Sequence, residues 1–219
     1  MPEVYLLDID EDLTAQEYHR LTKVLSQEKQ ERLSRFRFFV DAQRSLFGEI
    51  MARALLAERT GLPNERLLFR VNENGKPFLE SQQNIHFNIS HGGKYVACAI
   101  DDEPVGIDVE RIQEMDRGVA ERFFAPDEIS YVTAPPDETQ AERYIQIWTM
   151  KESRLKWEGI GLAKCLSSFS VLDKREDVYY HKVLQNSESI CYVCTLKASW
   201  PLCRILGKKD FMKMSETLL

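Results

Sequence analysis

The segment Val105-Gly-Ile-Asp-Val-Glu-Arg111 alternates apolar and polar residues with the period of two that a half-buried β-strand requires. On such a strand Asp108 and Glu110 project from one face, while Ile107 and Val109 point into the core on the other. Two carboxylates on a strand are most simply a solvated face. Held rigidly above a core, they would also suit magnesium, which takes hard oxygen ligands, commonly one or two carboxylates plus phosphate oxygens.

Helix signals precede this strand. Thr14-Ala-Gln-Glu17 has the form of a capping box, and a second helix should begin near Ser26. Asp41 is expected to cap a longer helix that ends at Gly61. The strands expected in this half, each bounded by turn residues, are Leu67–Val71, His86–Ser90, Tyr95–Ile100 and Val105–Arg111.

The second half repeats the order of helices followed by strands. Short helices are expected at Arg117–Phe124 and Pro126–Val132, and a long helix should open at the capping box Thr139-Gln-Ala-Glu142 and end near Gly159. The strands expected after it are Ser168–Leu172, Val178–Leu184, Ile190–Leu196 and Leu202–Leu206. The repeated order predicts an α+β fold of two similar halves, residues 1–112 and 113–219, that share one interface.

Composition restricts the class of protein. Of the 219 residues, 43% are hydrophobic and 29% are charged, values near those of soluble domains, and no apolar stretch is long enough to cross a bilayer. The first residues carry acids where a secretory signal needs basic residues. Five cysteines at irregular spacing argue against a disulfide framework. The sequence therefore predicts a cytoplasmic protein that has no membrane partner.

The distribution of charge points to a particular kind of ligand. The net charge of −6 argues against a nucleic-acid partner, which would need a broad basic surface. Between Arg20 and Arg53, however, eight Lys or Arg stand against four acids. This surplus of positive charge indicates either a solvated helix face or a site for a small, highly charged anion.

Two further segments carry groups suited to chemistry. Trp148, Glu152 and Lys156 are spaced by four and form one stripe on a helix, and the tryptophan favours the edge of a buried site over a surface ion pair. Phe87-Asn-Ile-Ser-His-Gly-Gly93 is a strand that enters a glycine turn, where free backbone amides could hold phosphate oxygens. Ser90 and the histidine after it point apart on a strand, which argues against a serine hydrolase.

Taken in order, these segments resemble a known family. Phe87–His91, Val105–Glu110 and Trp148–Lys156 are similar to the ordered signature of the surfactin-synthetase-type phosphopantetheinyl transferases. The resemblance extends from about Leu13 to about Val171. It also includes these earlier and intervening elements: Glu28-Lys29 with Arg32, Asp41-Ala-Gln-Arg44, Asn74-Gly-Lys-Pro77, Arg122-Phe-Phe124 and Glu128.

The resemblance implies a pseudo-twofold monomer with its active site between the halves, in which Asp108, Glu110 and Glu152 bind magnesium. The residues that it implies for binding coenzyme A are Lys29, Arg32, Arg44, Lys76, Ser90, His91 and Lys156. Lys29 and Arg32 would hold the 3′-phosphate. Glu152 would be the catalytic base, directly or through a metal-bound water, and Lys156 would stabilise the departing phosphate.

The activity implied is transfer of 4′-phosphopantetheine from coenzyme A to a serine of an apo acyl-carrier or peptidyl-carrier protein, with release of adenosine 3′,5′-bisphosphate. Such carriers serve fatty-acid, polyketide and nonribosomal peptide synthesis, including antibiotic synthesis. The segment Ile112–Phe124 is expected either to dock the carrier through apolar contacts or to face the core.

Two other functions stay open at this point. One is a different magnesium-dependent phosphotransferase or pyrophosphatase that acts on a nucleotide, which the order of the motifs disfavours. The other is a non-catalytic module of the same fold that binds coenzyme A or a carrier, which the complete set of acids and the helix lysine disfavours.

Overall fold

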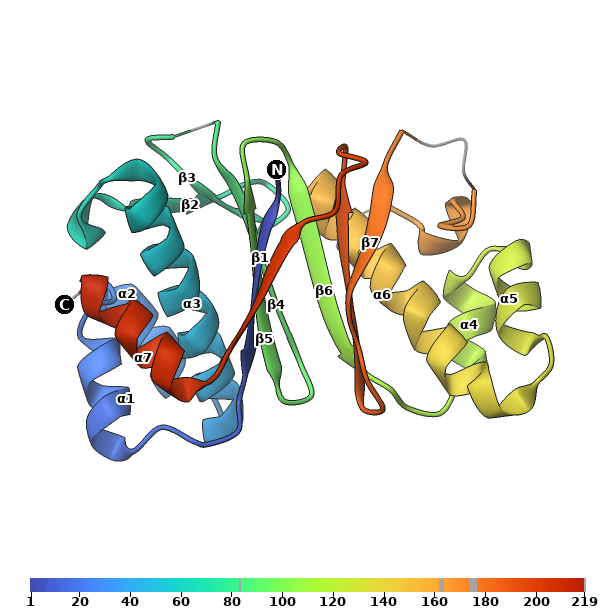
Figure 1. Cartoon of the computed structure of the whole chain (residues 1–219), viewed down its shortest axis with the longest axis horizontal. Helices are drawn as coiled ribbons and strands as arrows, with labels where there is room; N and C mark the ends of the chain where they lie inside the picture. Colours follow the sequence, from blue (N-terminus) through green and yellow to red (C-terminus); the bar gives the residue numbers. More distant parts are fainter. Residues whose placement is uncertain (83, 162–163, 174–176, 219) are drawn as a thin grey trace.

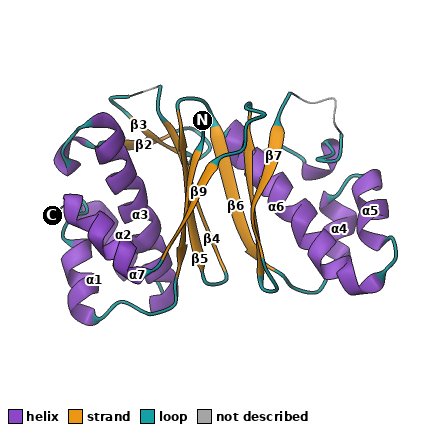
Figure 2. Ribbon diagram, in the orientation of Figure 1, coloured by secondary structure: helices purple, strands orange, loops and turns teal. Residues whose placement is uncertain are grey.

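Two β-sheets lie face to face at the centre of the molecule, and helices cover the outer side of each (Figures 1 and 2). The computed structural model describes the whole chain except residues 83, 162–163, 174–176 and 219. The fold is α+β, as the sequence predicts.

The bounds of the elements follow the chain order. The strands are β1 (Glu3–Asp8), β2 (Phe69–Val71), β3 (Pro77–Leu79), β4 (His86–Gly92), β5 (Tyr95–Asp101), β6 (Val105–Arg111), β7 (Tyr179–Gln185), β8 (Ser189–Thr195) and β9 (Leu202–Leu206). The α-helices are α1 (Ala15–Thr22), α2 (Gln27–Ser34), α3 (Phe39–Thr60), α4 (Arg117–Phe123), α5 (Pro126–Thr133), α6 (Gln140–Glu158) and α7 (Lys208–Ser215). Short 3₁₀ turns occur at Asn64–Arg66, Asp137–Thr139, Leu166–Ser168 and Glu216–Leu218.

The first sheet has the strand order β4-β5-β1-β9, and the second has the order β6-β8-β7. A separate hairpin, β2–β3, pairs Arg70 with Phe78. Strand alternation sends Val4 and Leu6 into the layer between the sheets, whereas Tyr5 and Leu7 enter the core beneath α3. A third apolar core lies between the second sheet and helices α4, α5 and α6.

Strand β1 is the largest element that was not predicted. No element was expected before Leu13, but Glu3–Asp8 runs antiparallel to β5, with Tyr5 opposite Cys98, and parallel to β9, with Tyr5 opposite Arg204. Both faces of β1 are buried. Its sequence therefore lacks the alternation that identifies a half-buried strand.

The chain crosses between the two sheets. Strand β6 was expected in the same half as β4 and β5, yet its backbone pairs with β8. Strand β9 was expected with the second half, but it pairs with β1, and α7 then packs against α3. The sheets thus exchange segments across the predicted boundary at residue 112, and the boundary itself stays a prediction.

Three local predictions are wrong. The helix expected to start at Asp41 begins at Phe39, because the Phe38 carbonyl already accepts hydrogen bonds from the amides of Asp41 and Ala42. Thr139 makes no capping hydrogen bond, since its hydroxyl donates to the Pro136 carbonyl instead.

The strand expected at Ser168–Leu172 is also absent. Ser168 ends a 3₁₀ turn, and the amide of Val171 donates to the Glu128 carboxylate, Oε1, at 2.7 Å. A side chain therefore takes the place that a neighbouring strand would have filled.

Candidate active site

Strand β6 and helix α6 approach each other unusually closely at Gly106. A Cβ atom at this position would lie 2.0 Å from the Ser153 carbonyl oxygen and 2.3 Å from the Trp157 amide nitrogen. Only glycine therefore permits the contact. Asp108 and Glu110 share the strand face of Gly106, so the same contact brings them beside Glu152 and Lys156 of α6.

Asp108 is the centre of this arrangement and is only 2% exposed. Its Oδ1 accepts a hydrogen bond from Lys156 Nζ at 2.6 Å and one from Ser90 Oγ at 2.8 Å. Lys156 Nζ also lies 2.9 Å from Ser90 Oγ. Strand β4 of the first sheet, strand β6 of the second sheet and helix α6 thus meet at one point.

The remaining carboxylates of the site are harder to ionise than ordinary ones. Burial, followed by the negative charge of Asp108, raises the pKa of Glu110 to about 7, although Trp148 donates a hydrogen bond to it. Burial and Asp108 also raise the pKa of Glu152, and Lys156 opposes the shift. Burial and the nearby charge of Asp108 therefore both disfavour the ionised form of these two acids.

The raised pKa of Glu110 predicts a pH-dependent stability in the metal-free protein. Between pH 4.5 and about 7 the folded state retains a proton that the unfolded chain has released, so the folded state loses stability as pH rises through this window. The Glu110→Gln variant lacks this titration, and its side-chain oxygen can still accept a hydrogen bond from Trp148. We expect the variant to melt about 2–8 °C higher than the unmutated protein at pH 8.

The measurement is thermal unfolding in chelator at pH 5 and pH 8. At pH 5 the two proteins should differ little, because both carry an uncharged side chain at position 110. Glu114→Gln, at an exposed position, is the matched control. Parallel pH profiles for Glu110→Gln and the unmutated protein would contradict the prediction.

The three acids Asp108, Glu110 and Glu152 are candidate ligands for a divalent cation. Among the described residues, no three His, Cys, Asp or Glu side chains stand close enough together to form a ready metal site. Asp108 Oδ2 is nevertheless buried and has no hydrogen-bond partner among the described atoms. Magnesium prefers hard oxygen ligands. The site offers this carboxylate oxygen and two neighbouring acids with raised pKa values, so its residues fit magnesium.

Four predicted cofactor-binding side chains meet at a second location. Lys29, Arg32, Arg44 and His91 line one hollow of about 250 Å³, together with Gly75, Pro77 and Ile89. Lys29 Nζ pairs with Glu49 Oε2 at 2.9 Å, and Arg44 donates to the Gly93 carbonyl and pairs with Asp41. The hollow is therefore a largely cationic pocket, and three of its cations belong to the basic stretch between Arg20 and Arg53.

His91 differs from the other three members of this pocket. Its ring still reaches solvent, but partial burial and then the charges of Lys156 and Arg44 lower its pKa. At neutral pH the imidazole is therefore uncharged in the free protein. It can offer a hydrogen bond to an anion.

Lys76 occupies an adjoining hollow of about 250 Å³, together with Asn88, Glu152 and Lys156. Its Nζ donates to the carbonyl oxygens of Val105 and Trp157, each at 3.2 Å. Burial lowers its pKa to about 8. Lys76 thus connects the β2–β3 hairpin to both β6 and α6.

Comparison with known proteins gives the same family along the chain. Residues 12–103 match the N-terminal 4′-phosphopantetheinyl transferase family, and residues 104–204 match the 4′-phosphopantetheinyl transferase superfamily. A 4′-phosphopantetheinyl transferase of Bacillus subtilis is 36% identical, covering 99% of this chain and 100% of the relative. The chain belongs to the 4′-phosphopantetheinyl transferase family.

Two further relatives agree. The 4′-phosphopantetheinyl transferase psf-1 of Bacillus pumilus is 38% identical over 88% of this chain and 82% of its own length. The 4′-phosphopantetheinyl transferase gsp of Aneurinibacillus migulanus is 39% identical over 80% of this chain and 73% of its own length. The resemblance to the surfactin-synthetase type and the prediction of a transferase are confirmed. In the described part of the transferase, no helix has the length and apolar character to span a membrane.

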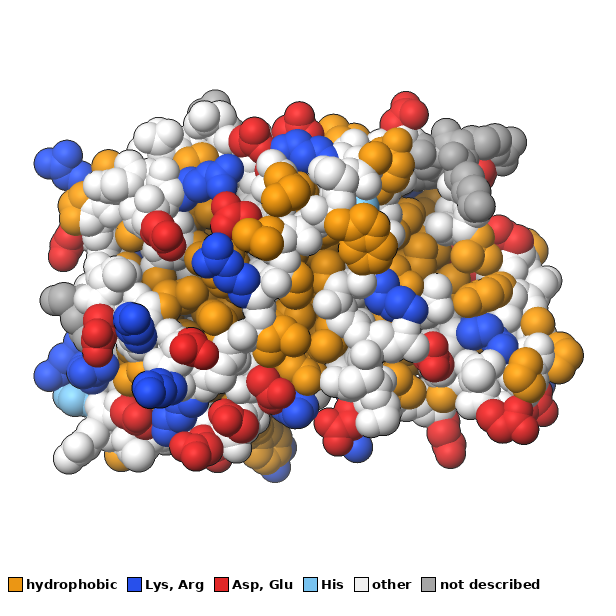
Figure 3. All heavy atoms as spheres, viewed as in Figure 1, with side chains coloured by type: hydrophobic (Ala, Val, Ile, Leu, Met, Phe, Trp, Pro, Cys, Tyr) orange, Lys and Arg blue, Asp and Glu red, His pale blue; other side chains and the backbone are white. Residues whose placement is uncertain are grey.

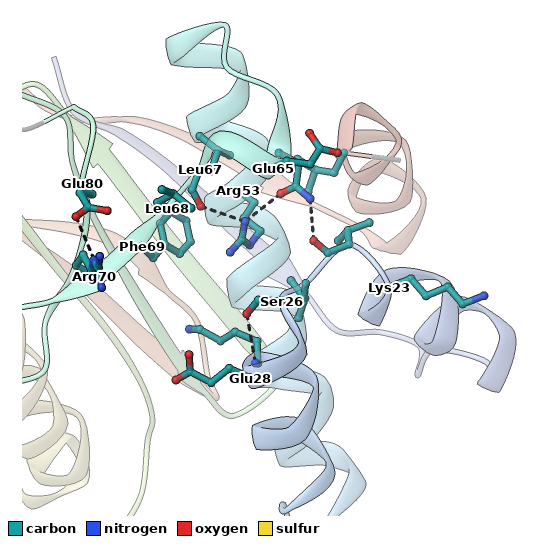
Figure 4. Close-up of a pocket in the computed structure, with 15 residues that line it drawn as sticks. Lys23, Ser26, Glu28, Arg53, Glu65, Leu67, Leu68, Phe69, Arg70 and Glu80 are labelled. Atoms are coloured by element: carbon teal, nitrogen blue, oxygen red, sulfur yellow. Dashed lines mark hydrogen bonds and ion pairs between the residues drawn. The ribbon is translucent and has the colours of Figure 1, made fainter.

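The sequence did not show what supports the cationic pocket of the transferase. Glu49 bridges Lys29 and Arg53, and Arg53 Nε lies 3.0 Å from Glu49 Oε1. Arg53 also lines a neighbouring hollow of about 720 Å³. There it donates hydrogen bonds to Asn64 and to the Leu67 carbonyl (Figure 4), and its guanidinium lies over the Phe69 ring. The spacing of four between Glu49 and Arg53 is the signal that could have revealed this pair.

The segment Ile112–Phe124 was expected either to dock a carrier or to face the core, and its apolar side chains pack against the core while most of its polar residues are exposed. Phe124 is fully buried against Tyr144, with ring centroids 5.5 Å apart. Met115 and Val119 are half-buried against the same core. The docking role of this segment stays a prediction.

Proposed function

We propose that the transferase takes 4′-phosphopantetheine from coenzyme A and attaches it to a serine of an apo acyl-carrier or peptidyl-carrier protein. The observation that carries the proposal is the meeting of Lys156, Asp108 and Ser90, which lie on three different elements, beside the cationic pocket. Coenzyme A carries three phosphate groups, and the site offers cations at two places along its length. The pocket would take the 3′-phosphate and the adenosine end, and the carboxylate cluster would receive the pyrophosphate.

The reaction follows from this placement. The carrier serine oxygen attacks the phosphorus that bears pantetheine, and the bond from that phosphorus to the bridging oxygen breaks. Adenosine 3′,5′-bisphosphate then leaves with the electron pair. Glu152 takes the serine proton, which its raised pKa favours near neutral pH. Lys156 donates hydrogen bonds to the oxygen on which charge develops.

Asp108, Glu110 and Glu152 are the residues that would hold magnesium. When bound, the ion would neutralise phosphate charge and make the attacked phosphorus more electrophilic. Lys156 binds Asp108 in the absence of an ion, and its half-exposed side chain can turn from the carboxylate toward a phosphate. With an ion bound, Asp108 would keep a cationic partner while Lys156 turned toward the phosphate.

The deciding experiment is to incubate the purified protein with coenzyme A, magnesium chloride and several apo-carrier domains, and then to weigh each carrier. A phosphopantetheine adduct on a serine supports the proposal. Adenosine 3′,5′-bisphosphate released without any carrier adduct would instead indicate a pyrophosphatase. Coenzyme A binding without either product would indicate a non-catalytic module.

The proposal also covers the partners, the location and the oligomeric state of the protein. The net charge of −6 supports the absence of a nucleic-acid partner. A cytoplasmic location and a monomeric state also form part of the proposal. Sedimentation of the purified protein with and without coenzyme A would test the monomeric state.

Lys29 and Arg32 are proposed to bind the 3′-phosphate of coenzyme A. Both lie on α2, three residues apart, and both line the cationic pocket. A charged hydrogen bond contributes about 1.5–3 kcal/mol, so losing one of the two should weaken coenzyme A binding roughly ten- to a hundredfold. The effect of Lys29→Ala should be the smaller, because Lys29 also pairs with Glu49 in the free protein.

The control is dephospho-coenzyme A, which lacks only that phosphate. Calorimetry should find that the Lys29→Ala, Arg32→Ala double variant binds it as well as the unmutated protein does. Arg20→Ala, an exposed change on α1, should alter neither affinity. Equal weakening for both cofactors would mean that these side chains do not read the 3′-phosphate.

A further inference from the structure

The segment Arg32–Val40, which runs from the last turn of α2 through the connection into the first residues of α3, exposes an unusual run of aromatic residues. Phe38 is 57% exposed, Phe39 is 49% exposed and Val40 is 42% exposed. Soluble proteins rarely leave adjacent large apolar side chains in water without a use for them. Three arginines and no acid accompany them in this segment. We call the residues Arg35–Val40 the aromatic strip.

Local stability does not explain the strip. Phe38 occupies the N-cap of α3 and makes no side-chain hydrogen bond there, although serine or aspartate at this position would satisfy a free amide. The Arg37 guanidinium lies over the Phe38 ring, 5.2 Å from its centroid, and so shields one face only. A residue that breaks the local rule without a structural gain points to a function.

The strip lies next to the cationic pocket of the proposed active site. Val40 and Arg44 line one hollow of about 360 Å³ with Gly93 and Arg111. Arg44 also lines the cationic pocket. A partner seated on the strip would therefore stand beside the cofactor pocket.

We propose that the aromatic strip docks the carrier protein, an inference that rests on the proposed function. The carrier surface that fits it has an apolar centre, which would cover Phe38 and Phe39, and a rim of carboxylates, which would face Arg35 and Arg37. Such a surface complements a basic, apolar patch on a protein whose net charge is −6. Aromatic and arginine side chains commonly contribute most of the binding energy in protein interfaces.

A second exposed apolar region provides a control. Figure 3 shows apolar side chains gathered on the face over β7 and β9, and Ile205 of β9 is 59% exposed. This region lies outside the hollows that hold the proposed site residues. Ile205→Asp therefore matches the chemical change at Phe38 without touching the strip or the site.

The test is the Phe38→Asp variant, assayed with an apo-carrier that the unmutated protein modifies. Aspartate is a good N-cap, so the melting temperature should stay equal or rise. The value of kcat/KM for the carrier should fall about ten- to a hundredfold, while the Kd for coenzyme A stays within twofold. Ile205→Asp should change neither quantity. Arg35→Ala with Arg37→Ala should flatten the dependence of the carrier KM on salt.

Each other outcome has a definite meaning. A carrier kcat/KM within twofold of the unmutated value in Phe38→Asp would overturn the docking role. Weaker coenzyme A binding in the same variant, with the carrier KM unchanged, would assign the strip to the cofactor pocket and also overturn it. Failure of the unmutated protein to modify any carrier would instead count against the proposed function.

Discussion

Replacing Asp108 with asparagine is expected to lower kcat/KM for carrier modification about a thousandfold or more. Asparagine keeps the size of the side chain and can still accept from Ser90, but it removes the charge that Lys156 contacts at 2.6 Å. It also removes one of three acids that can hold a divalent cation. Loss of transition-state stabilisation amounting to about 4 kcal/mol corresponds to a factor of a thousand.

The fold should survive this change. Lys156 is half-exposed and can turn to water, so the melting temperature should shift by only a few degrees. Residual activity should respond much less steeply to added magnesium than the activity of the unmutated protein. Glu103→Gln, which removes an exposed acid from the β5–β6 turn, should leave turnover unchanged. Asp108→Asn activity within tenfold of the unmutated value would contradict the assignment, as would full turnover in excess chelator.

The strand that carries the site could be predicted because its chemistry is local. Alternation over Val105–Arg111 places the acids on one face and the core on the other, whatever the strand pairs with. The stripe of Trp148, Glu152 and Lys156 is equally local, since a spacing of four fixes one helix face. Both predictions needed no knowledge of long-range contacts.

The exchange of strands between sheets could not be predicted in this way. Nothing in the sequence Leu202–Leu206 indicates that it pairs with Glu3–Asp8 at the other end of the chain, because either sheet could accept an apolar strand. The close approach at Gly106 is likewise invisible until α6 is placed on β6. Partners that lie far apart along the chain are set by tertiary packing, and the local pattern does not encode them.

The ion pair that supports the cationic pocket, between Lys29 and Glu49, could not be predicted from the sequence either. The spacing of Lys29 and Arg32 predicted one face of α2, and the structure confirms that both line one pocket. The same spacing could not show that Glu49 of α3 already pairs with Lys29. An ion pair between two helices depends on how they pack, so the resting partner of a binding residue emerges only from the fold.

Breaking the buried ion pair between Lys151 and Glu128 is expected to produce the largest loss of stability. Both side chains are 0% exposed, and Lys151 Nζ lies 2.8 Å from Glu128 Oε2. Lys151→Met leaves the carboxylate buried without its cation, which typically costs about 3–5 kcal/mol. For a protein of this size the melting temperature should fall by about 6–20 °C. Thermal and urea unfolding would measure the loss, with Lys182→Met as an exposed control.

The paired replacement Lys151→Met, Glu128→Leu distinguishes this site from an ordinary buried ion pair. Replacing both charges with apolar residues is often neutral or stabilising. Here we expect little recovery, because the pair also satisfies four backbone groups. Lys151 donates to the Leu166 and Phe169 carbonyls at 2.8 and 2.7 Å, and Glu128 accepts from the amides of Ala125 and Val171, both at 2.7 Å. Each buried backbone group left without a partner costs about 1–3 kcal/mol. A double variant as stable as the unmutated protein would contradict this prediction. It would show that the four backbone hydrogen bonds add nothing to the free energy of unfolding, and that the single variant is unstable only because it leaves one charge unpaired.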